Sequence, residues 1–209
     1  MLATMGQCMP LSPTPPQEPE RRKLAGFLRR RKQFVEARKA EKLRRHSAGH
    51  PEILRDIDSL IALFDRRIAK LDKRIAAIIA ASPQLKEQAR LLSQVPGIGP
   101  TVLATLLGEL PELAHLDRRR IASLAGLAPH ARESGTWKGA RRIWGGRRKV
   151  REALYIAALT ATRRVPALIA LRDRMRAAGK APKTILIAAA RQLLVILNAM
   201  IRHRQTIRL

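Results

Sequence analysis

The sequence predicts an all-α protein in which a basic helix and a long coiled-coil helix precede a small helical domain. Aromatic residues make up only 3% of the 209 residues, and the composition favours helices over sheets. The apolar fraction of 46% is large enough to form a core. An unbroken apolar repeat fills residues 51–82. We therefore expect a disordered Pro-rich leader (1–19), a basic and coiled-coil dimerisation region (20–82), and a domain with a helix-hairpin-helix motif and a basic Gly-rich loop (83–209).

The charge balance points to a polyanionic partner. There are 42 Lys and Arg residues against 16 Asp and Glu, for a net charge of +26, so compaction is costly unless an anion neutralises the chain. Nucleic acid is the obvious polyanion, and an anionic membrane surface is the rival. The single Cys8 excludes a disulfide framework and a Cys-based zinc site.

A membrane partner is not expected. The most apolar stretch, residues 185–201, is short for a membrane span and contains Arg191, Gln192 and Asn198, so it predicts a buried core helix. No apolar run follows a basic start at the N-terminus, which gives no sign of a signal peptide. We therefore expect a cytoplasmic protein.

Residues 20–47 form a strongly basic predicted helix after the prolines of the leader, which oppose helix formation. Twelve Lys and Arg residues but only two acids, Glu36 and Glu41, lie between Arg21 and Arg45. Such a run is either a solvated face or an arm that contacts phosphates. Two further basic clusters downstream favour the phosphate-contacting arm.

Residues 51–82 carry a heptad seam that predicts dimerisation. Its members are Leu54, Ile57, Ile61, Phe64, Ile68, Leu71, Ile75 and Ile78. With Leu54 at position a, Asp58, Asp65 and Asp72 occupy e, and Arg67 and Arg74 occupy g. Parallel pairing brings g of one helix to e of the other, so this pattern favours a parallel homodimer. The alternative is an intrachain helical hairpin with the preceding basic helix.

The segment around residues 96–101 predicts a tight turn between two short helices. Gly97 and Gly99 allow close backbone approach, Ile98 fills the angle between the helices, and Pro100 suits a first helical turn. The backbone N–H groups from Gly97 to Thr101 could bind a DNA phosphate without reading sequence. This spacing resembles the helix-hairpin-helix motif. The alternative is a helical corner whose glycines serve packing.

Residues 117–151 combine many cations with glycine. Asp117 is a candidate helix cap, and four glycines from Gly135 to Gly146 predict an exposed, flexible loop. Arginine can bind phosphate with two hydrogen bonds, so the cations of this stretch are candidate DNA ligands. They are Arg132, Lys138, Arg141, Arg142, Arg147, Arg148 and Lys149. Trp137 and Trp144 could stack on bases or anchor the loop, and anchoring is favoured.

Several short motifs occur in an order that is similar to the C-terminal transposase domain of the insertion-sequence 110/116/902 family. They are Val95-Pro-Gly-Ile-Gly-Pro, Leu124-Ala-Gly-Leu-Ala-Pro129, Ser134-Gly135, Gly145-Gly-Arg-Arg-Lys-Val-Arg151 and Leu154-Tyr-Ile-Ala-Ala-Leu159. The resemblance covers roughly residues 20–205. It implies DNA transposition, with Ser134 as the nucleophile that forms a phosphoserine link to DNA. It also implies a divalent metal such as Mg²⁺ in an N-terminal RuvC-like half, and a guide RNA in some members.

The sequence departs from that family because only some 19 residues precede the basic helix. We expect the RuvC-like half to be missing, no metal site or cofactor in this chain, and no activity from the chain alone. The acids stand in the coiled coil, at helix ends or singly, which predicts no substitute metal site. The second hypothesis is a non-catalytic helix-hairpin-helix protein that binds DNA or RNA.

Overall fold

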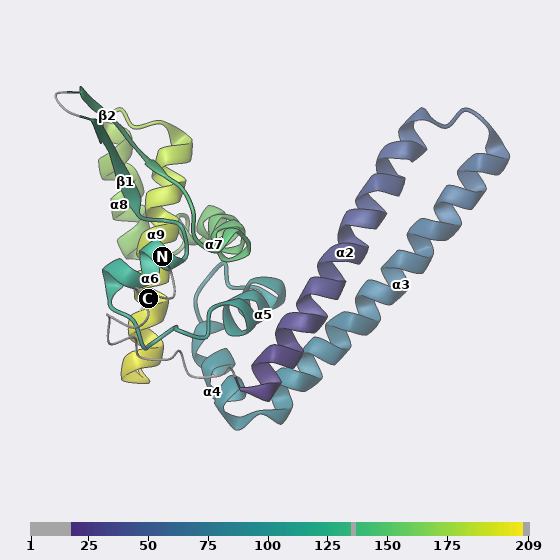
Figure 1. Ribbon diagram of the computed structural model, residues 1–209, viewed down its shortest axis with the longest axis horizontal. Helices are drawn as coiled ribbons and strands as arrows, with labels where there is room; N and C mark the ends of the chain where they lie inside the picture. Colours follow the sequence, from purple (N-terminus) through teal and green to yellow (C-terminus); the bar gives the residue numbers. More distant parts are fainter. Residues whose placement is uncertain (1–17, 135–136, 207–209) are drawn as a thin grey trace, which may run out of the picture.

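The computed structural model describes residues 18–134 and 137–206, and these ranges contain eight helices and one two-stranded hairpin (Figure 1). The predicted helical class is confirmed. The predicted leader falls almost entirely on residues 1–17, which lie outside the described residues.

Two long helices form an antiparallel hairpin that projects from the rest of the molecule (Figure 1). These are α2 (Pro19–Ser47) and α3 (Pro51–Ala81), and each begins at a proline, which suits the first helical turn. Only residues 48–50 connect them, and so short a link favours antiparallel neighbours.

The heptad seam of α3 packs against α2 of the same chain. Ile57, Ile68 and Ile75 are buried along it, and the ring centroids of Phe34 and Phe64 lie 6.0 Å apart across the two helices. In a single chain, α3 therefore pairs with α2 as an intramolecular hairpin, which was the alternative left by the sequence. It does so in place of the expected parallel pairing with a second chain. A homodimer remains a prediction, and one through this seam would require the hairpin to open.

The acids of α3 also pair within the chain. Asp72 accepts from Arg31 at 2.5 Å, Asp58 accepts from Arg45 at 2.6 Å, and Asp65 pairs with Arg38. These are the e positions that were expected to meet Arg67 and Arg74 of a second chain. The heptad pattern located the interface correctly, but the arginines that complete it come from the preceding helix.

The remaining helices form a second unit around a central apolar helix. They are α4 (Pro83–Leu92), α5 (Pro100–Glu109), α6 (Arg118–Leu124), α7 (Arg148–Ala161), α8 (Pro166–Ala177) and α9 (Pro182–His203). Leu193, Leu194 and Leu197 of α9 are completely buried, together with Leu154 of α7 and Leu168 of α8. The residues predicted to form a core helix therefore do so.

A buried arginine fastens the base of the α2–α3 hairpin to this unit. Arg21 is 5% exposed and donates to the backbone oxygen of Leu107 at 2.8 Å and to the side chain of Gln88 at 2.9 Å. Leu24 and Leu28 continue into the same core. At least one cation of the basic helix is thus structural, because a buried guanidinium needs hydrogen-bond partners.

The stretch expected to be a flexible loop contains a β-hairpin. Strands β1 (Pro129–Ser134) and β2 (Trp137–Ile143) are antiparallel, with Pro129 opposite Ile143 at the base and Ser134 opposite Trp137 at the far end. Only residues 135–136 separate the strands. A two-residue connection that begins with Gly is a hairpin signal, and the Gly-rich composition of the stretch obscured it.

Two glycines at the foot of this hairpin are required by close backbone contact. A Cβ on Gly146 would lie 2.3 Å from the backbone nitrogen of Gly126, and both residues have a positive φ. The N–H of Arg147 donates to the oxygen of Leu124 at 2.8 Å. The Leu-Ala-Gly-Leu and Gly-Gly-Arg motifs, distant in the sequence, therefore meet in the fold.

Among the described helices, α9 is long and apolar enough to cross a membrane. Half of that stretch is buried inside the protein, as in a core helix. Length and composition alone are weak evidence for a span, and the packing of α9 agrees with the predicted core role.

Candidate nucleic-acid interface

The turn between α4 and α5 has one packed side and one open side. A Cβ on Gly97 would lie 2.4 Å from the backbone oxygen of Ala157, and its φ is +99°, so Gly97 serves contact with α7. Ile98 is 6% exposed and fills the corner as predicted. A Cβ on Gly99 would meet no heavy atom within 4 Å, so the lack of a side chain there is not needed for packing.

The open side presents unused hydrogen-bond donors. Within the described residues, the backbone N–H groups of Gly99 and Thr101 have no acceptor, and both residues are exposed. The first N–H groups of a helix have no partner in the helix itself, and they carry partial positive charge. The geometry thus leaves Gly99 and Thr101 able to accept an anion, whereas Gly97 and Ile98 support the turn.

The strand ends place Ser134 away from the foot of the β-hairpin. It is the last residue of β1, five positions beyond Pro129, which corresponds to about 17 Å of extended strand. The side chains of residues 130–142 lie outside what the structure describes. The predicted roles of Ser134, Arg132, Lys138, Arg141 and Arg142 therefore rest on their backbone positions in the hairpin.

The cations that follow the hairpin are paired with acids. Arg147 binds both carboxylate oxygens of Glu112, one of them at 2.5 Å, and also donates to the backbone oxygen of Glu109. Lys149 lies 2.6 Å from the carboxylate of Glu109, and Arg148 lies 2.6 Å from that of Glu152. Of these three predicted DNA ligands, Arg147 and Lys149 connect α7 to the end of α5, and Arg148 pairs within α7.

The Glu112 carboxylate is held in its charged form. Partial burial is the largest single effect and raises the pKa of Glu112. The hydrogen bonds from Arg147, a backbone hydrogen bond and the positive charges of Arg147 and Arg21 together outweigh it, so the pKa is lowered from its ordinary value. Both side chains are about 30% exposed (31% for Arg147 and 29% for Glu112), so this pair is only partly screened by water. Arg147 is therefore well placed to stabilise the fold.

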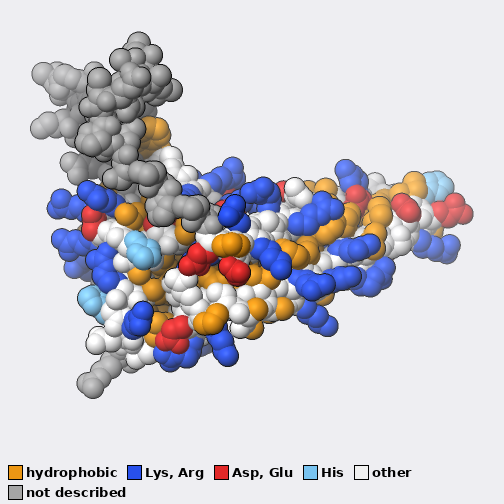
Figure 2. All heavy atoms as spheres, turned by 60° about the horizontal axis from the view of Figure 1, so that its bottom comes forward, with side chains coloured by type: hydrophobic (Ala, Val, Ile, Leu, Met, Phe, Trp, Pro, Cys, Tyr) orange, Lys and Arg blue, Asp and Glu red, His pale blue; other side chains and the backbone are white. Residues whose placement is uncertain are grey.

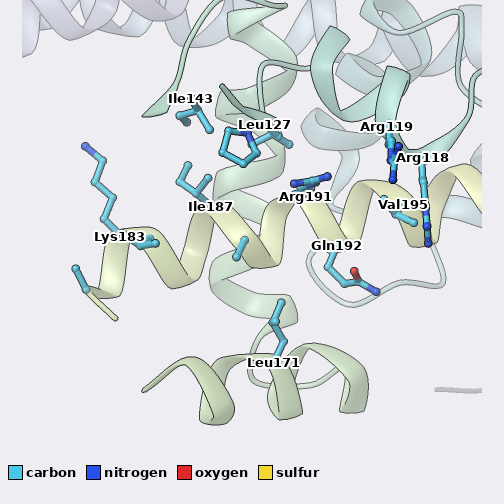
Figure 3. A pocket seen from close by; sticks show the side chains of 14 residues that line it. Arg118, Arg119, Leu127, Ile143, Leu171, Lys183, Ile187, Arg191, Gln192 and Val195 are labelled. Atoms are coloured by element: carbon cyan, nitrogen blue, oxygen red, sulfur yellow. The ribbon is translucent and has the colours of Figure 1, made fainter. Parts of the chain in front are cut away.

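A large cleft opens where the β-hairpin meets α9. Its volume is about 1100 Å³. Pro129 and Ile143, which face each other at the foot of the β-hairpin, line the cleft together with Leu127 and with Ile187 of α9 (Figure 3). The floor of this cleft is therefore apolar, and it joins directly onto the element that ends in Ser134.

Among the described residues, four cations and no acid line the cleft. They are Arg118, Arg119, Lys183 and Arg191. Figure 3 shows Lys183 toward one end of α9, Arg118 and Arg119 toward the other end, and Arg191 between them. None of the four side chains forms an ion pair with the described acids. Lys183 and Arg191 alone span about 12 Å along the helix axis.

Sequence reasoning missed this cleft. Arg118 and Arg119 follow the cap residue Asp117, whose carboxylate accepts from the N–H groups of Arg119 and Arg120 as predicted. Arg191 is a cation inside the most apolar stretch of the sequence, where Gln192 and Asn198 are the other polar residues, and it was a local signal of a special position. Only the packing of α6 beside α9 brings these cations together.

The tryptophan next to the β-hairpin is exposed. Trp144 has 70% of its surface exposed, and its favoured role in anchoring the loop stays a prediction. Trp137 lies outside the described side chains. An exposed indole near a basic cleft offers a surface on which a base can stack.

The acids in the described part of the chain are not arranged as a divalent metal site. No three His, Cys, Asp or Glu side chains come together within the described residues. Glu109 and Glu112 are occupied by Lys149 and Arg147, and Asp117 caps α6. A two-metal site needs several converging carboxylates that are free to bind metal, and we derive no metal-dependent step for these residues.

Comparison with protein families agrees with the order of motifs. Residues 89–174 match the model of the Transposase IS116/IS110/IS902 family. The matched segment runs from α4 through the turn, the cleft-lining α6 and the β-hairpin to α8. The chain belongs to this family.

Individual relatives extend the match over most of the chain. The pilin gene-inverting protein of Moraxella bovis is 34% identical over 71% of this chain and 47% of its own length. An insertion element IS110 protein of Streptomyces coelicolor is 35% identical over 69% of this chain and 35% of its own. An insertion element IS900 protein of Mycobacterium paratuberculosis is 30% identical over 86% and 47%. The chain thus spans half or less of the length of these relatives.

Proposed function

We propose that this chain is the DNA-binding and strand-joining part of a transposase, and that it acts in DNA recombination. The observation that carries the proposal is the basic cleft at the foot of the β-hairpin whose far end is Ser134, a cleft that the described residues line with four cations and no acid. The family membership supports the reaction class, and the name of the Moraxella relative describes inversion of a gene.

The cleft fits a DNA backbone by charge and by extent. Its four cations match phosphates spaced along a strand, and its apolar floor can contact sugars and bases. The strand β1 measures about 17 Å from base to Ser134, and one DNA strand advances 3.4 Å per nucleotide along the helix axis. If the β-hairpin ran parallel to the DNA axis, a phosphate held in the cleft would lie about five nucleotides from a phosphate at Ser134.

Ser134 is the proposed nucleophile. Its Oγ would attack the phosphorus of a phosphodiester, forming an Oγ–P bond while one P–O bond to the neighbouring nucleotide breaks. The serine proton passes to the departing oxygen, so the strand ends in a free hydroxyl. The phosphoserine link keeps the energy of the broken bond for rejoining. Arg132, Lys138, Arg141 and Arg142 are the cations of the same hairpin that could stabilise the added charge.

Covalent trapping tests this reaction. The chain is incubated with duplex DNA containing element ends, alone and together with a full-length relative such as the Moraxella bovis protein, and resolved on a denaturing gel. We expect a protein–DNA adduct that is lost in Ser134→Ala and kept in the control Ser123→Ala, an exposed serine on α6. If no adduct forms even with the full-length relative, the nucleophile is wrong.

A non-catalytic DNA- or RNA-binding protein is the second candidate. The cleft and the α4–α5 turn favour it, because both can hold phosphates without any reaction. Binding of DNA by the Ser134→Ala variant at wild-type affinity, with no adduct from the wild type, would select this candidate. A guide RNA or a homodimer is compatible with either function.

The α4–α5 turn can be tested separately as a phosphate ligand. Gly99→Ala has room for its methyl group, so the fold should be unchanged, but the methyl would stand beside the free N–H groups. We expect severalfold weaker binding of duplex DNA in a fluorescence anisotropy titration. Gly49→Ala, which also has open space, is the matched control. Equal affinities for both variants would assign the turn to packing alone.

A further inference from the structure

The two edges of the α2–α3 hairpin differ in charge. Along one edge, three arginines of α2 pair with three aspartates of α3, as described above. The opposite edge is a groove of about 560 Å³, lined by Lys23, Phe27, Arg30, Phe34, Arg67, Lys70, Leu71 and Arg74. Five of these eight residues are cations, and none of the acids in the described part of the chain lines the groove. One edge is neutral and the other is strongly positive.

The positive edge is available to a ligand. Lys23, Arg67, Lys70 and Arg74 are exposed, and none of them forms an ion pair with the described acids. The hairpin projects from the molecule, and Figure 2 shows Lys and Arg side chains along its visible face with apolar side chains between them. Five like charges over so short a distance repel one another, and an anion would relieve that repulsion.

The floor of the groove is aromatic, which distinguishes it from a simple phosphate-binding face. Phe27 and Phe34 are partly exposed between the cations. The guanidinium of Arg30 lies over the ring of Phe34, with its central carbon 4.3 Å from the ring centroid. Aromatic rings and guanidinium planes flanked by cations are the surfaces on which unpaired bases stack while their phosphates are neutralised.

We propose that this groove binds an unpaired DNA strand, with its phosphates on Arg67, Lys70 and Arg74 and its bases stacked on Phe27 and Arg30. Duplex DNA keeps its bases stacked on one another and would use only the cations. Cations and aromatic rings can bind either kind of single strand, and membership of a transposase family favours a DNA strand in this groove. This site lies on α2 and α3 and does not depend on Ser134 or on the cleft.

Charge-preserving substitutions test the stacking. In the full chain, Arg30→Lys keeps the charge but removes the planar guanidinium, and Arg29→Lys makes the same change on the exposed neighbour outside the groove. We expect Arg30→Lys to weaken binding of a fluorescent twelve-nucleotide oligo-dT by about tenfold. The affinity of the Arg30→Lys variant for a twelve-base-pair duplex should change less than twofold. The Arg29→Lys variant should bind both the oligo-dT and the duplex as tightly as the wild type does.

Charge removal tests the phosphate contacts. Arg67→Ala combined with Lys70→Ala should weaken oligo-dT binding and reduce the magnitude of the log–log salt slope by about 1.4, at roughly 0.7 per contact. Arg66→Ala with Lys73→Ala removes the same charges from exposed positions of α3 outside the groove, and should have a much smaller effect. Unfolding curves recorded in parallel should agree among all variants.

Three results would overturn the proposal. If the groove variant (Arg67→Ala with Lys70→Ala) and the control variant (Arg66→Ala with Lys73→Ala) lose the same affinity for oligo-dT, only net charge matters. A larger loss for duplex than for oligo-dT would make the groove a duplex surface. Binding of oligo-rU much tighter than oligo-dT, with the same response to Arg30→Lys, would assign the groove to RNA.

Discussion

Two cationic regions of the α4–α9 unit contrast with each other. The first is Arg147 to Lys149, part of a strongly basic run in the sequence, and its three cations are all paired with glutamates. The second is the cleft between α6 and α9, whose cations come from segments more than 60 residues apart and form no ion pair with the described acids. A cluster of cations in the sequence is therefore a poor guide to which cations can bind a ligand.

The physical reason for the contrast is that acids and bases meet through packing. Glu109 and Glu112 lie at and just beyond the end of α5, and α7 packs against α5, so the cations at the start of α7 find partners there. Helix α9 carries no acid, and α6 has none either. The described residues of α6 and α9 therefore give the cleft between them a positive charge.

The largest effect is expected for the paired region. Arg147→Ala would leave the half-buried carboxylate of Glu112 and the oxygen of Glu109 without their donor, and should lower the free energy of unfolding by about 2 kcal/mol. Urea denaturation followed by circular dichroism measures this change. An unchanged midpoint, accompanied by a loss of DNA affinity, would place Arg147 among the DNA ligands instead.

The next effect concerns the cleft. Arg119→Ala with Arg191→Ala should weaken duplex DNA binding about tenfold or more and reduce the magnitude of the log–log salt slope by about 1.8, because two phosphate contacts are lost. Stability should change by less than about 0.5 kcal/mol, since neither side chain has an ion-pair partner among the described acids. Anisotropy titrations at several salt concentrations provide the measurement.

A matched control for the cleft removes the same charge elsewhere. Arg163 and Arg164 are exposed between α7 and α8 and do not line the cleft. Arg163→Ala with Arg164→Ala should retain most of the affinity. If both double variants bind equally weakly, the cleft has no special role and the contrast between the two regions fails.

A pH dependence sharpens the assignment of Arg147. The pKa of Glu112 is lowered in the folded protein, so its pairing stabilises the fold above the unfolded pKa of about 4.3, and this contribution is lost as the pH falls through the folded value. The stability difference between wild type and Arg147→Ala should therefore narrow by about 1 kcal/mol between pH 7 and pH 3. A constant difference would show that the carboxylate is not the relevant partner.

The smallest effect is expected for Arg148→Ala. Arg148 is 80% exposed and pairs with Glu152 one helical turn away, so solvent screens the interaction and the change in unfolding free energy should be about 0.3 kcal/mol. Duplex DNA affinity should also change less than twofold. A large loss of affinity without a loss of stability would return Arg148 to the interface.

Local patterns predicted much of the fold. Apolar periodicity predicted the long helices, Asp117 was predicted as a cap, and the glycines and proline around Ile98 predicted the turn. These features depend on neighbours a few residues away. The β-hairpin was missed because glycines in its sequence suggested a loop. The contact of Gly126 with Gly146 could not be foreseen, since nothing local links two glycines twenty residues apart.

The sequence by itself determined the helical class, the order of the family's motifs, and which face of residues 51–82 must be covered. Only the tertiary structure decided that α2 covers that face, that Arg147 and Lys149 are held by glutamates, and that Arg118, Arg119, Lys183 and Arg191 share one cleft. Periodicity encodes the direction in which a side chain points, because it follows from the helix repeat. The partner that it meets depends on contacts between distant segments.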